Sequence, residues 1–264
     1  MAYESLADVY DAFNEDANYE ALYEKIQSVL HRAGISKGII ADLGCGTGDM
    51  TLMLAQSGYD MIGIDASEEM LCILREKAAE LEVEGLLLLQ QDLRQLDLYG
   101  TIHAAISTFD TFNHIGPYEE FEKALVRSAL FIEPGGIFLF DLNTPYKQEH
   151  ILANHTYEME AQDVLCLWKN RYNEKTRATH ISVEIRDKET GERETDAFVE
   201  YAYDLPQVRR ACEEAGLNIL EICDGETFGE LTPTSQRYCI TAVKRSDKNC
   251  NAIYQSKENE AWED

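Results

Sequence analysis

The sequence predicts an α/β protein in which an antiparallel β-meander is inserted into a doubly wound, seven-stranded sheet. Two observations lead to this prediction. Between about residues 20 and 145, short and almost continuously apolar runs alternate with segments of helical periodicity. After Pro145 the apolar residues recur with a period near two, and polar turns separate the segments, as in an antiparallel sheet with one polar face.

Five apolar runs in the first part predict parallel strands that are covered on both faces. They are residues 38–44, 59–65, 86–92, 101–107 and 136–142. Between the second and the third run, residues 67–81 predict a helix. Apolar residues recur there at helical spacing, Ser67 can cap the first turn, and Glu68 and Glu69 favour the N-terminus. Strands and helices in repeated alternation predict the doubly wound arrangement.

The second part of the chain predicts the meander and the end of the main sheet. Segments 163–173, 179–187 and 195–204 alternate with a period near two. Residues 205–216 return to helical spacing, and residues 217–225 and 237–245 predict two closing strands. We therefore expect a main domain of residues 1–145 and 205–245, an inserted substrate or lid subdomain of residues 146–204, and an acidic tail over residues 246–264.

Charge and composition narrow the classes of partner. The chain has 23 basic and 49 acidic residues, a net charge of −26. Because such a surface repels phosphate backbones and no basic stripe offsets it, nucleic acid is disfavoured as a substrate. No run approaches the length of a membrane span, and the acidic N-terminus does not resemble a secretion signal, so we expect a cytoplasmic protein. No cluster has the spacing of metal ligands, so we expect no metal.

A glycine-rich turn follows the first predicted strand and indicates a cofactor site. The stretch is ADLGCGTGDMT, residues 41–51, with glycines at 44, 46 and 48. Asp65 ends the next strand 21 residues beyond Gly44, about where an acidic residue holds a ribose. The dinucleotide fingerprint G-x-G-x-x-G would require glycine at position 49, which is aspartate here.

Charge at this turn favours a cationic cofactor over a dinucleotide. Asp42 and Asp49 would repel a pyrophosphate. S-adenosylmethionine has no phosphate and carries an ammonium and a sulfonium, so the same carboxylates would attract it. The turn and Asp65 therefore predict S-adenosylmethionine as the cofactor. The alternative is a tight turn that only lets a helix pack on a strand.

The stretch D-L-G-C-G-T-G resembles the glycine loop of class I S-adenosylmethionine-dependent methyltransferases. Three further stretches resemble later motifs of that family: GIDAS-EEML (63–71), QQDLRQLDL (90–98) and FIEPGGIFLFDLN (131–143). The resemblance covers residues 1–145 and 205–245 and implies a Rossmann-like fold. It implies that the cofactor contacts Asp42, Gly44, Cys45, Gly46, Asp65, Ala66, Met70, Asp92 and Leu93. Asp92 could instead cap a turn, and Asp65 could be an ordinary strand-end residue.

The segment after the fourth strand is expected to flank the methyl group, because ligands of doubly wound sheets bind at the carboxyl ends of the strands. It reads STFDTFNH, residues 107–114. It resembles the D-x-x-N-[HY] stretch of a bacterial subgroup of small-molecule methyltransferases that is related to glycine and amino-sugar N-methyltransferases. Thr108 is expected near the methionine part of the cofactor, and Asp110, Asn113 and His114 near the acceptor. Alternatively, Asp110 and Asn113 cap the next helix or brace the loop.

Two aromatic segments could cover the site. The N-terminal stretch resembles the Y-D-x-F segment that forms a lid in this subgroup, with apolar cover from Tyr3, Tyr10 and Phe13 and a hydrogen bond from Tyr10 to the methionine carboxylate. A plain amphipathic helix is the alternative. The meander carries Trp168, Tyr172, Phe198, Tyr201 and Tyr203. These residues could line an acceptor pocket, although we expect most of them in a small core.

Together these features predict methyl transfer from S-adenosylmethionine to nitrogen or oxygen of a small-molecule acceptor. A nitrogen acceptor needs no strong base, whereas a hydroxyl acceptor would need His114 or Asp110 as one. One alternative is an RNA or protein methyltransferase of the same fold. The acidic surface and S-T-F-D in place of an N-P-P-[YF] motif disfavour that alternative. The other is a module that binds S-adenosylmethionine without catalysis.

Overall fold

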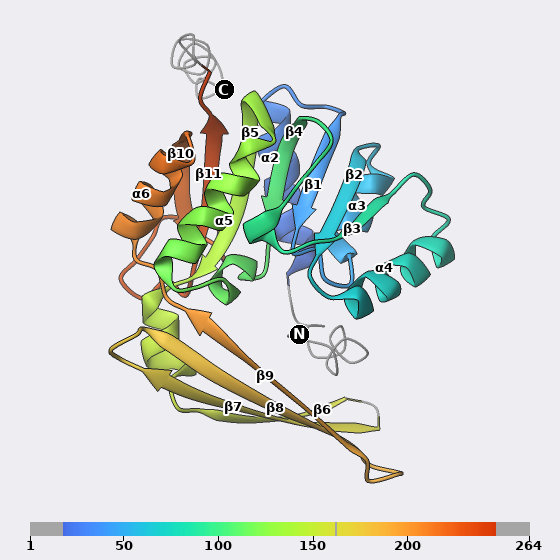
Figure 1. The fold of residues 1–264 in the computed structure, drawn as a ribbon, viewed down its shortest axis with the longest axis vertical. Helices are drawn as coiled ribbons and strands as arrows, with labels where there is room; N and C mark the ends of the chain where they lie inside the picture. The colour runs from blue at the N-terminus through green and yellow to red at the C-terminus, as the bar shows by residue number, and fades with distance from the viewer. Residues whose placement is uncertain (1–17, 162, 247–264) are drawn as a thin grey trace.

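The computed structural model describes residues 18–161 and 163–246, which form two sheets (Figure 1). The larger sheet has seven strands in the order β10-β11-β5-β4-β1-β2-β3, and the smaller has four in the order β6-β7-β8-β9. The predicted doubly wound sheet with an inserted meander is therefore confirmed. The predictions for Tyr3, Tyr10 and Phe13, and for residues 247–264 of the tail, lie outside the described residues.

The seven-stranded sheet is parallel except at one end. Its strands are β1 (Ile39–Leu43), β2 (Asp60–Asp65), β3 (Leu87–Gln90), β4 (Ile102–Ser107), β5 (Ile132–Asn143), β10 (Leu217–Asp224) and β11 (Arg237–Lys244). Strand β11 runs antiparallel to both of its neighbours, β5 and β10. The strand order reverses between β1 and β4, which is where doubly wound sheets bind their ligands.

Strand β5 begins earlier than the apolar run predicts. It starts at Ile132 rather than at residue 136, and its pairing with β4 slips from Ile102↔Ile132 to Ala104↔Ile137. The segment between includes Gly135, whose φ of +87° is a left-handed conformation. The residues before 136 thus form a bulge within a longer strand, and the apolar run did not reveal them as strand because a bulge interrupts the apolar pattern in the same way as a turn.

Helices cover both faces of the large sheet (Figure 1). They are α2 (Tyr19–Arg32), α3 (Asp49–Gln56), α4 (Glu68–Glu80), α5 (Tyr118–Leu130) and α6 (Leu205–Glu214), with short 3-10 turns η1 (Leu93–Gln95) and η2 (Thr111–His114). Successive residues of each central strand face opposite sides. In β5, Phe138 and Phe140 pack in the core that contains α5 and α6, while Ile137 and Leu139 pack in the core that contains α2 and α3. This alternation explains why the strands are apolar throughout.

The insert follows β5 as a π-helical turn, η3 (Lys147–Leu152), and four antiparallel strands. These are β6 (Thr156–Ala161), β7 (Val164–Asn173), β8 (Ala178–Asp187) and β9 (Arg193–Tyr201). The last three were predicted from the sequence, and β6 was not. This edge strand packs apolar side chains on one face only, and its other positions are largely charged. A core of Cys166, Ile181, Val183 and Phe198, with Trp168 packed against it, holds the small sheet together.

The insert rejoins the main domain at Asp204, which caps helix α6. Its side chain accepts a hydrogen bond from the backbone of Gln207, and the Gln207 side chain accepts one from the Asp204 backbone, a reciprocal capping box. Arg177, from the turn between β7 and β8, pairs with the Asp204 carboxylate at 3.0 Å. In residues 18–161 and 163–246, none of the helices is both long and apolar enough to cross a membrane.

Candidate cofactor and acceptor site

A cavity of about 360 Å³ opens at the carboxyl ends of β1, β2, β3 and β4. Of the residues proposed from the sequence, those that line it are Gly44, Cys45, Gly46, Asp65, Ala66, Met70, Asp92, Leu93, Thr108 and His114. Asp42, Asp110 and Asn113 are not in its wall, and Tyr10 lies outside the described residues. The cavity therefore brings together residues of the glycine loop and the segment after β4, although sixty positions separate them in the sequence.

The glycine loop is fixed to the neighbouring strand by its backbone. The amides of Gly44 and Cys45 both donate to the carbonyl of Ile64, at 2.7 and 3.0 Å. Gly48 caps helix α3 with a left-handed conformation. Because no side chains stand on these glycines, backbone groups and the N-terminus of α3 face the cavity.

Asp65 connects the glycine loop to the start of helix α4. Its Oδ2 accepts a hydrogen bond from the Gly46 amide and its Oδ1 accepts one from the Ser67 amide, both at 2.9 Å. Burial raises the pKa of the Asp65 carboxyl, and these backbone hydrogen bonds oppose that rise. The carboxylate oxygens can accept more hydrogen bonds than these, so Asp65 can also bind a hydrogen-bond donor of a ligand in the cavity.

Asp92 follows β3 and presents a second carboxylate to the cavity. It caps the η1 turn by accepting from the Arg94 amide, and the Arg94 guanidinium binds both of its oxygens. The hydrogen bond from the Arg94 side chain lowers the pKa of Asp92, so this group is ionised at neutral pH. The alternative role of Asp92 as a turn cap is therefore seen in the structure, and the residue lines the cavity as well. Met70 and Leu93 add buried apolar surface beside it.

Asp42 occupies a different place from the one the sequence suggested. It is 1% exposed beneath the loop, where Thr51 Oγ1 donates to its Oδ2 at 2.6 Å. Burial raises the pKa of Asp42 to about 7, partly offset by the Thr51 hydrogen bond. Asp49 does line the cavity, where Lys77 pairs with it at 2.8 Å. Repulsion of a pyrophosphate would thus come from Asp65 and Asp92 more than from Asp42.

The segment after β4 is held by a buried network that sequence spacing did not reveal. Asp141, in β5, accepts hydrogen bonds from the amides of Phe109 and Asp110, at 2.8 and 2.6 Å. Arg237, at the start of β11, bridges Asp141 and Asp110 at 2.9 and 2.8 Å. These contacts stabilise Phe109 and Asp110, which both have a φ of +57°. Burial is the largest single influence on Asp110 and opposes its ionisation, but the neighbouring positive charges, chiefly Arg237 and then Lys147, together outweigh it and the pKa of Asp110 is lowered.

Asn113 braces the same segment from within the core. It is completely buried, and its Oδ1 accepts from the Asn143 amide at 2.8 Å. Its Nδ2 donates to the carbonyls of Asn143 and Tyr201, at 3.2 and 2.8 Å. The side chain thus ties η2 to β5 and to the end of β9, which is the bracing role that the sequence left as an alternative.

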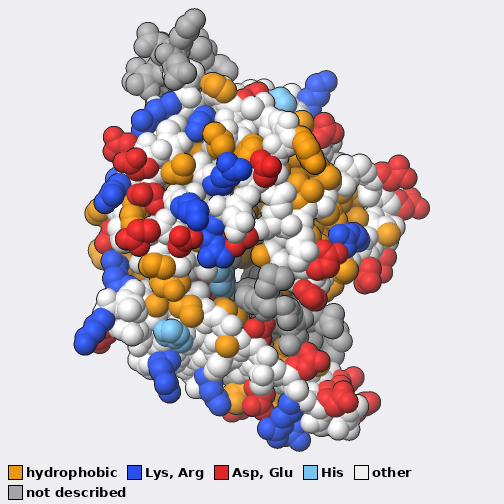
Figure 2. Space-filling model, viewed as in Figure 1, with side chains coloured by type: hydrophobic (Ala, Val, Ile, Leu, Met, Phe, Trp, Pro, Cys, Tyr) orange, Lys and Arg blue, Asp and Glu red, His pale blue; other side chains and the backbone are white. Residues whose placement is uncertain are grey.

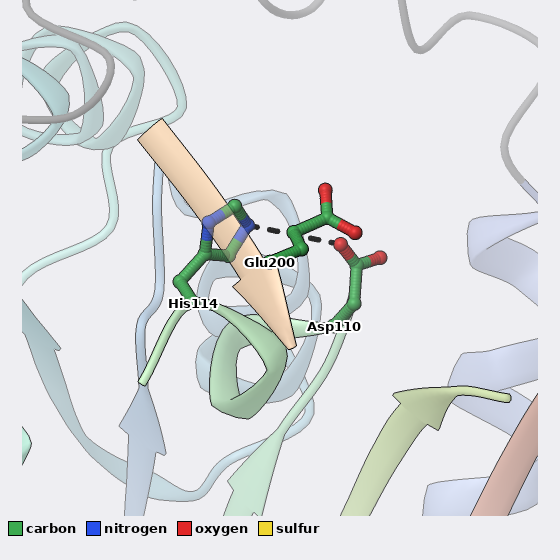
Figure 3. A group of neighbouring side chains, drawn as sticks. All are labelled: Asp110, His114 and Glu200. Atoms are coloured by element: carbon green, nitrogen blue, oxygen red, sulfur yellow. Dashed lines mark ion pairs between the residues drawn. The ribbon is translucent and has the colours of Figure 1, made fainter. Parts of the chain in front are cut away.

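His114 stands in the cavity wall, and two carboxylates converge on it (Figure 3). Its Nε2 is 3.8 Å from Asp110 Oδ2, and one ligand-type atom from each of Asp110, His114 and Glu200 lies within 4.8 Å of the others. Glu200 comes from β9 of the insert. Glu200 was not predicted from the sequence, because no spacing relates it to the segment after β4.

Comparison with known proteins identifies the family. Residues 40–136 match the family model described as a methyltransferase domain. The provisionally named methyltransferase YqeM of Bacillus subtilis is 30% identical over 171 residues, which are 64% of this chain and 67% of that protein. Another, from a Geobacillus species, is 27% identical over 248 residues, 92% of this chain and 100% of that protein.

Solved structures share the whole fold. The crystal structure of an S-adenosylmethionine-dependent methyltransferase from Clostridium acetobutylicum has a TM-score of 0.83 at 22% identity, covering 92% of this chain and 99% of that one. The chain belongs to the methyltransferases.

Two further similar proteins carry names that state a nitrogen acceptor. One is the dTDP-3-amino-3,4,6-trideoxy-α-D-glucopyranose N,N-dimethyltransferase of Streptomyces venezuelae, 26% identical over 137 residues, 51% of this chain and 56% of that protein. The other is the structure of the sugar N-methyltransferase KedS8 from a Streptoalloteichus species, with a TM-score of 0.71 at 19% identity over 90% of this chain and 93% of that one.

Proposed function

We propose that the protein transfers the methyl group of S-adenosylmethionine to a small-molecule acceptor, at nitrogen in preference to oxygen. The observation that carries this proposal is that one cavity is lined on one wall by residues expected to bind the cofactor and on another wall by residues expected near the methyl group and the acceptor. The glycine loop, Asp65 and Asp92 form one, and Thr108 and His114 form the other. The nitrogen acceptor is supported by the names of the amino-sugar and sugar N-methyltransferases that resemble this chain in sequence or in fold.

The residues of the first wall suit the cofactor. Among residues 18–161 and 163–246, nothing lies within 4 Å of a Cβ built on Gly46, so this part of the chain leaves room for a ligand against the loop backbone. In the proposal, the open lone pairs of Asp65 accept hydrogen bonds from the ribose hydroxyls, and Asp92, Leu93 and Met70 surround the adenine. The cavity volume of about 360 Å³ lies in the range of small-molecule sites.

The second wall would orient the acceptor. The cofactor supplies a methyl group on a sulfonium, a reactive centre that needs an aligned nucleophile more than further activation. Thr108 and the strained segment that follows it would hold that nucleophile in line with the methyl group, and a site closed to water would supply most of the acceleration. We also propose that the insert, residues 146–204, closes the acceptor side.

Two measurements test the proposed function. First, the protein is incubated with S-adenosylmethionine carrying a tritiated methyl group and with pooled metabolites. We expect label in small molecules, whereas binding without any transfer would contradict the proposal.

Second, calorimetry measures the affinity for S-adenosylhomocysteine. We expect Asp65→Ala to weaken binding by about tenfold or more, because two ligand hydrogen bonds to a charged group are lost. The matched control is Asp60→Ala, an exposed carboxylate at the other end of β2, which should leave the affinity unchanged.

A further inference from the structure

The inserted sheet brings a buried carboxylate to the acceptor end of the cavity. Glu200 lies near the end of β9 and is only 4% exposed. Its Oε2 accepts hydrogen bonds from Gln148 Nε2 and from Asn143 Nδ2, the latter at 3.3 Å. Thr179 in turn donates to the Gln148 side chain. The carboxylate is thus held from β5, η3 and β8 together, and its position is fixed.

His114 is the residue that links Glu200 to the cavity. It lines the cavity, and its imidazole lies against the carboxylates of Glu200 and Asp110 (Figure 3). The ring of Phe198, which stands two residues before Glu200 on the same face of β9, has its centroid 5.3 Å from that of the imidazole. The insert therefore supplies both an apolar wall and a charge to this histidine.

The charges around His114 favour an additional positive charge. Asp110 and Glu200 adjoin the imidazole, and the charge on His114 also stabilises ionised Asp65 across the cavity wall. Behind them lie one more carboxylate and two cations: Asp141 of β5, Arg237 of β11 and Lys147 of η3. These groups are four carboxylates and two cations, so the imidazole lies among more negative than positive side chains.

We propose that Glu200 is a positioning residue for proton transfer. Together with Asp110 it orients the imidazole of His114. The two carboxylates also stabilise the imidazolium that forms when His114 takes a proton from an ammonium acceptor. The N–H bond of the acceptor breaks, its electron pair stays on nitrogen, and the proton forms a bond to His114. That electron pair is then the nucleophile for the methyl group. This inference rests on the proposed function and deepens it, because it makes the insert part of the catalytic machinery.

Two observations support a proton rather than a metal ion at this cluster. Carboxylates and imidazole do bind divalent metals. Here, however, Arg237 already pairs with Asp110 at 2.8 Å, and the charge of Lys147 acts on both carboxylates. Burial, and then the charge of Asp110, raise the pKa of Glu200, so its ionised form gains from a protonated neighbour.

The test compares Glu200→Gln with Glu194→Gln in the full-length protein. Glutamine can keep the hydrogen bonds from Gln148 and Asn143 while the charge is removed. Glu194 is an exposed carboxylate on the same strand, so its variant controls for the loss of one charge. Three quantities are measured: S-adenosylhomocysteine affinity, methyl transfer to glucosamine and to triglycine, and the NMR titration of the His114 ring in the S-adenosylhomocysteine complex.

For Glu200→Gln we expect unchanged S-adenosylhomocysteine affinity, a fall in kcat of about tenfold or more, and a His114 titration midpoint lower by about half a pH unit or more. That shift is what the loss of one charge at about 4–5 Å produces even in a medium as polar as water. Glu194→Gln should match the parent protein in all three quantities.

Three results would overturn the inference: an unmoved His114 titration, a loss of cofactor affinity that marks a purely structural role, or transfer that stops with EDTA and returns with Mn²⁺. If the parent protein methylates neither amine, the nitrogen acceptor of the proposed function fails, while the titration still decides the role of Glu200.

Discussion

Three glycines shape the cavity wall through backbone conformations that a side chain would strain. Gly44, Gly46 and Gly48 have φ values of +74°, +54° and +87°. A Cβ would lie 2.2 Å from Thr111 at Gly44 and 2.0 Å from Leu74 at Gly48, so these two glycines also permit close packing. At Gly46 no atom of the described part of the chain lies within 4 Å of that position, which leaves space there for a ligand.

A matched pair of substitutions separates strain from steric exclusion of the cofactor. Gly46→Ala and Gly58→Ala each place a Cβ at a positive φ with open space around it, but only Gly46 lines the cavity. We expect each to lower the free energy of unfolding by about 1–2 kcal/mol. Only Gly46→Ala should weaken S-adenosylhomocysteine binding, by about tenfold or more in calorimetry. Equal affinities of the two variants would show that the ligand does not approach Gly46.

Asp42 predicts a pH dependence of stability. Its pKa is raised by burial from 3.8 to about 7, so between these values the folded protein binds the proton more tightly than the unfolded chain. Stability is therefore lost as the pH rises through this range, by up to about 4 kcal/mol, and the penalty is complete above pH 7. Asp42→Asn can keep the Thr51 hydrogen bond and should remove this loss.

The measurement for Asp42 is urea unfolding of the ligand-free protein and of Asp42→Asn at pH 5, 6, 7 and 8. The difference in the free energy of unfolding between them should change in favour of the variant as the pH rises. Parallel curves over the whole range would mean that Asp42 is ionised in the folded protein without cost.

Some charged residues of the site could be predicted from the sequence, and others could not. The end of a predicted strand and the glycine loop predicted Asp65, and the family resemblance implied Asp92; both residues lie at the edge of the sheet where the carboxyl ends of the strands meet, and both line the cavity. Asp141, Arg237 and Glu200 belong to the same region but come from β5, β11 and the insert. Only the pairing of β5 with β11 and the packing of the insert beside them bring these charges together, and no local spacing in the sequence indicates it.

Among the helices and strands, the spacing of apolar residues predicted those elements whose buried faces leave a clear pattern in the sequence. The central strands were recognised because both faces are covered, and helix α4 because Ser67 caps it as its sequence suggests. Strand β6 was missed because an edge strand needs few apolar residues, and the start of β5 was missed because a bulge resembles a turn.

The junction between the insert and helix α6 offers a test of one capping residue. Asp204 both caps α6 and pairs with Arg177. Asparagine is an equally good N-cap, whereas a partly exposed ion pair contributes little. We therefore expect Asp204→Asn to change the free energy of unfolding by less than about 0.5 kcal/mol and Asp204→Ala to lower it by about 1 kcal/mol. Equal losses in urea unfolding would instead assign the stabilisation to the ion pair.

Over the whole molecule, the charges of the surface and those of the site are arranged differently. The chain carries a net charge of −26, and on the face shown in Figure 2 the basic side chains stand among acidic ones. Inside the site, by contrast, Arg237 and Lys147 each interact with particular carboxylates. The acidic surface disfavours phosphate-rich partners, and the ammonium acceptor that we propose would meet carboxylates in the site, so both act in the same direction.

A net charge this large destabilises the compact state through self-repulsion, because folding brings the acidic side chains closer together. Salt weakens this repulsion: the distance over which charges act falls from about 30 Å at 0.01 M to about 10 Å at 0.1 M ionic strength. We therefore expect Tm to rise by several degrees between 10 mM and 200 mM NaCl, and to rise equally in KCl, since screening does not depend on the identity of the cation. Most of the rise should occur below 0.2 M, where screening changes fastest. A Tm that falls over this range would show that attractive ion pairs outweigh the net repulsion, and a rise that begins only above 0.5 M would indicate ion exclusion from the surface rather than screening.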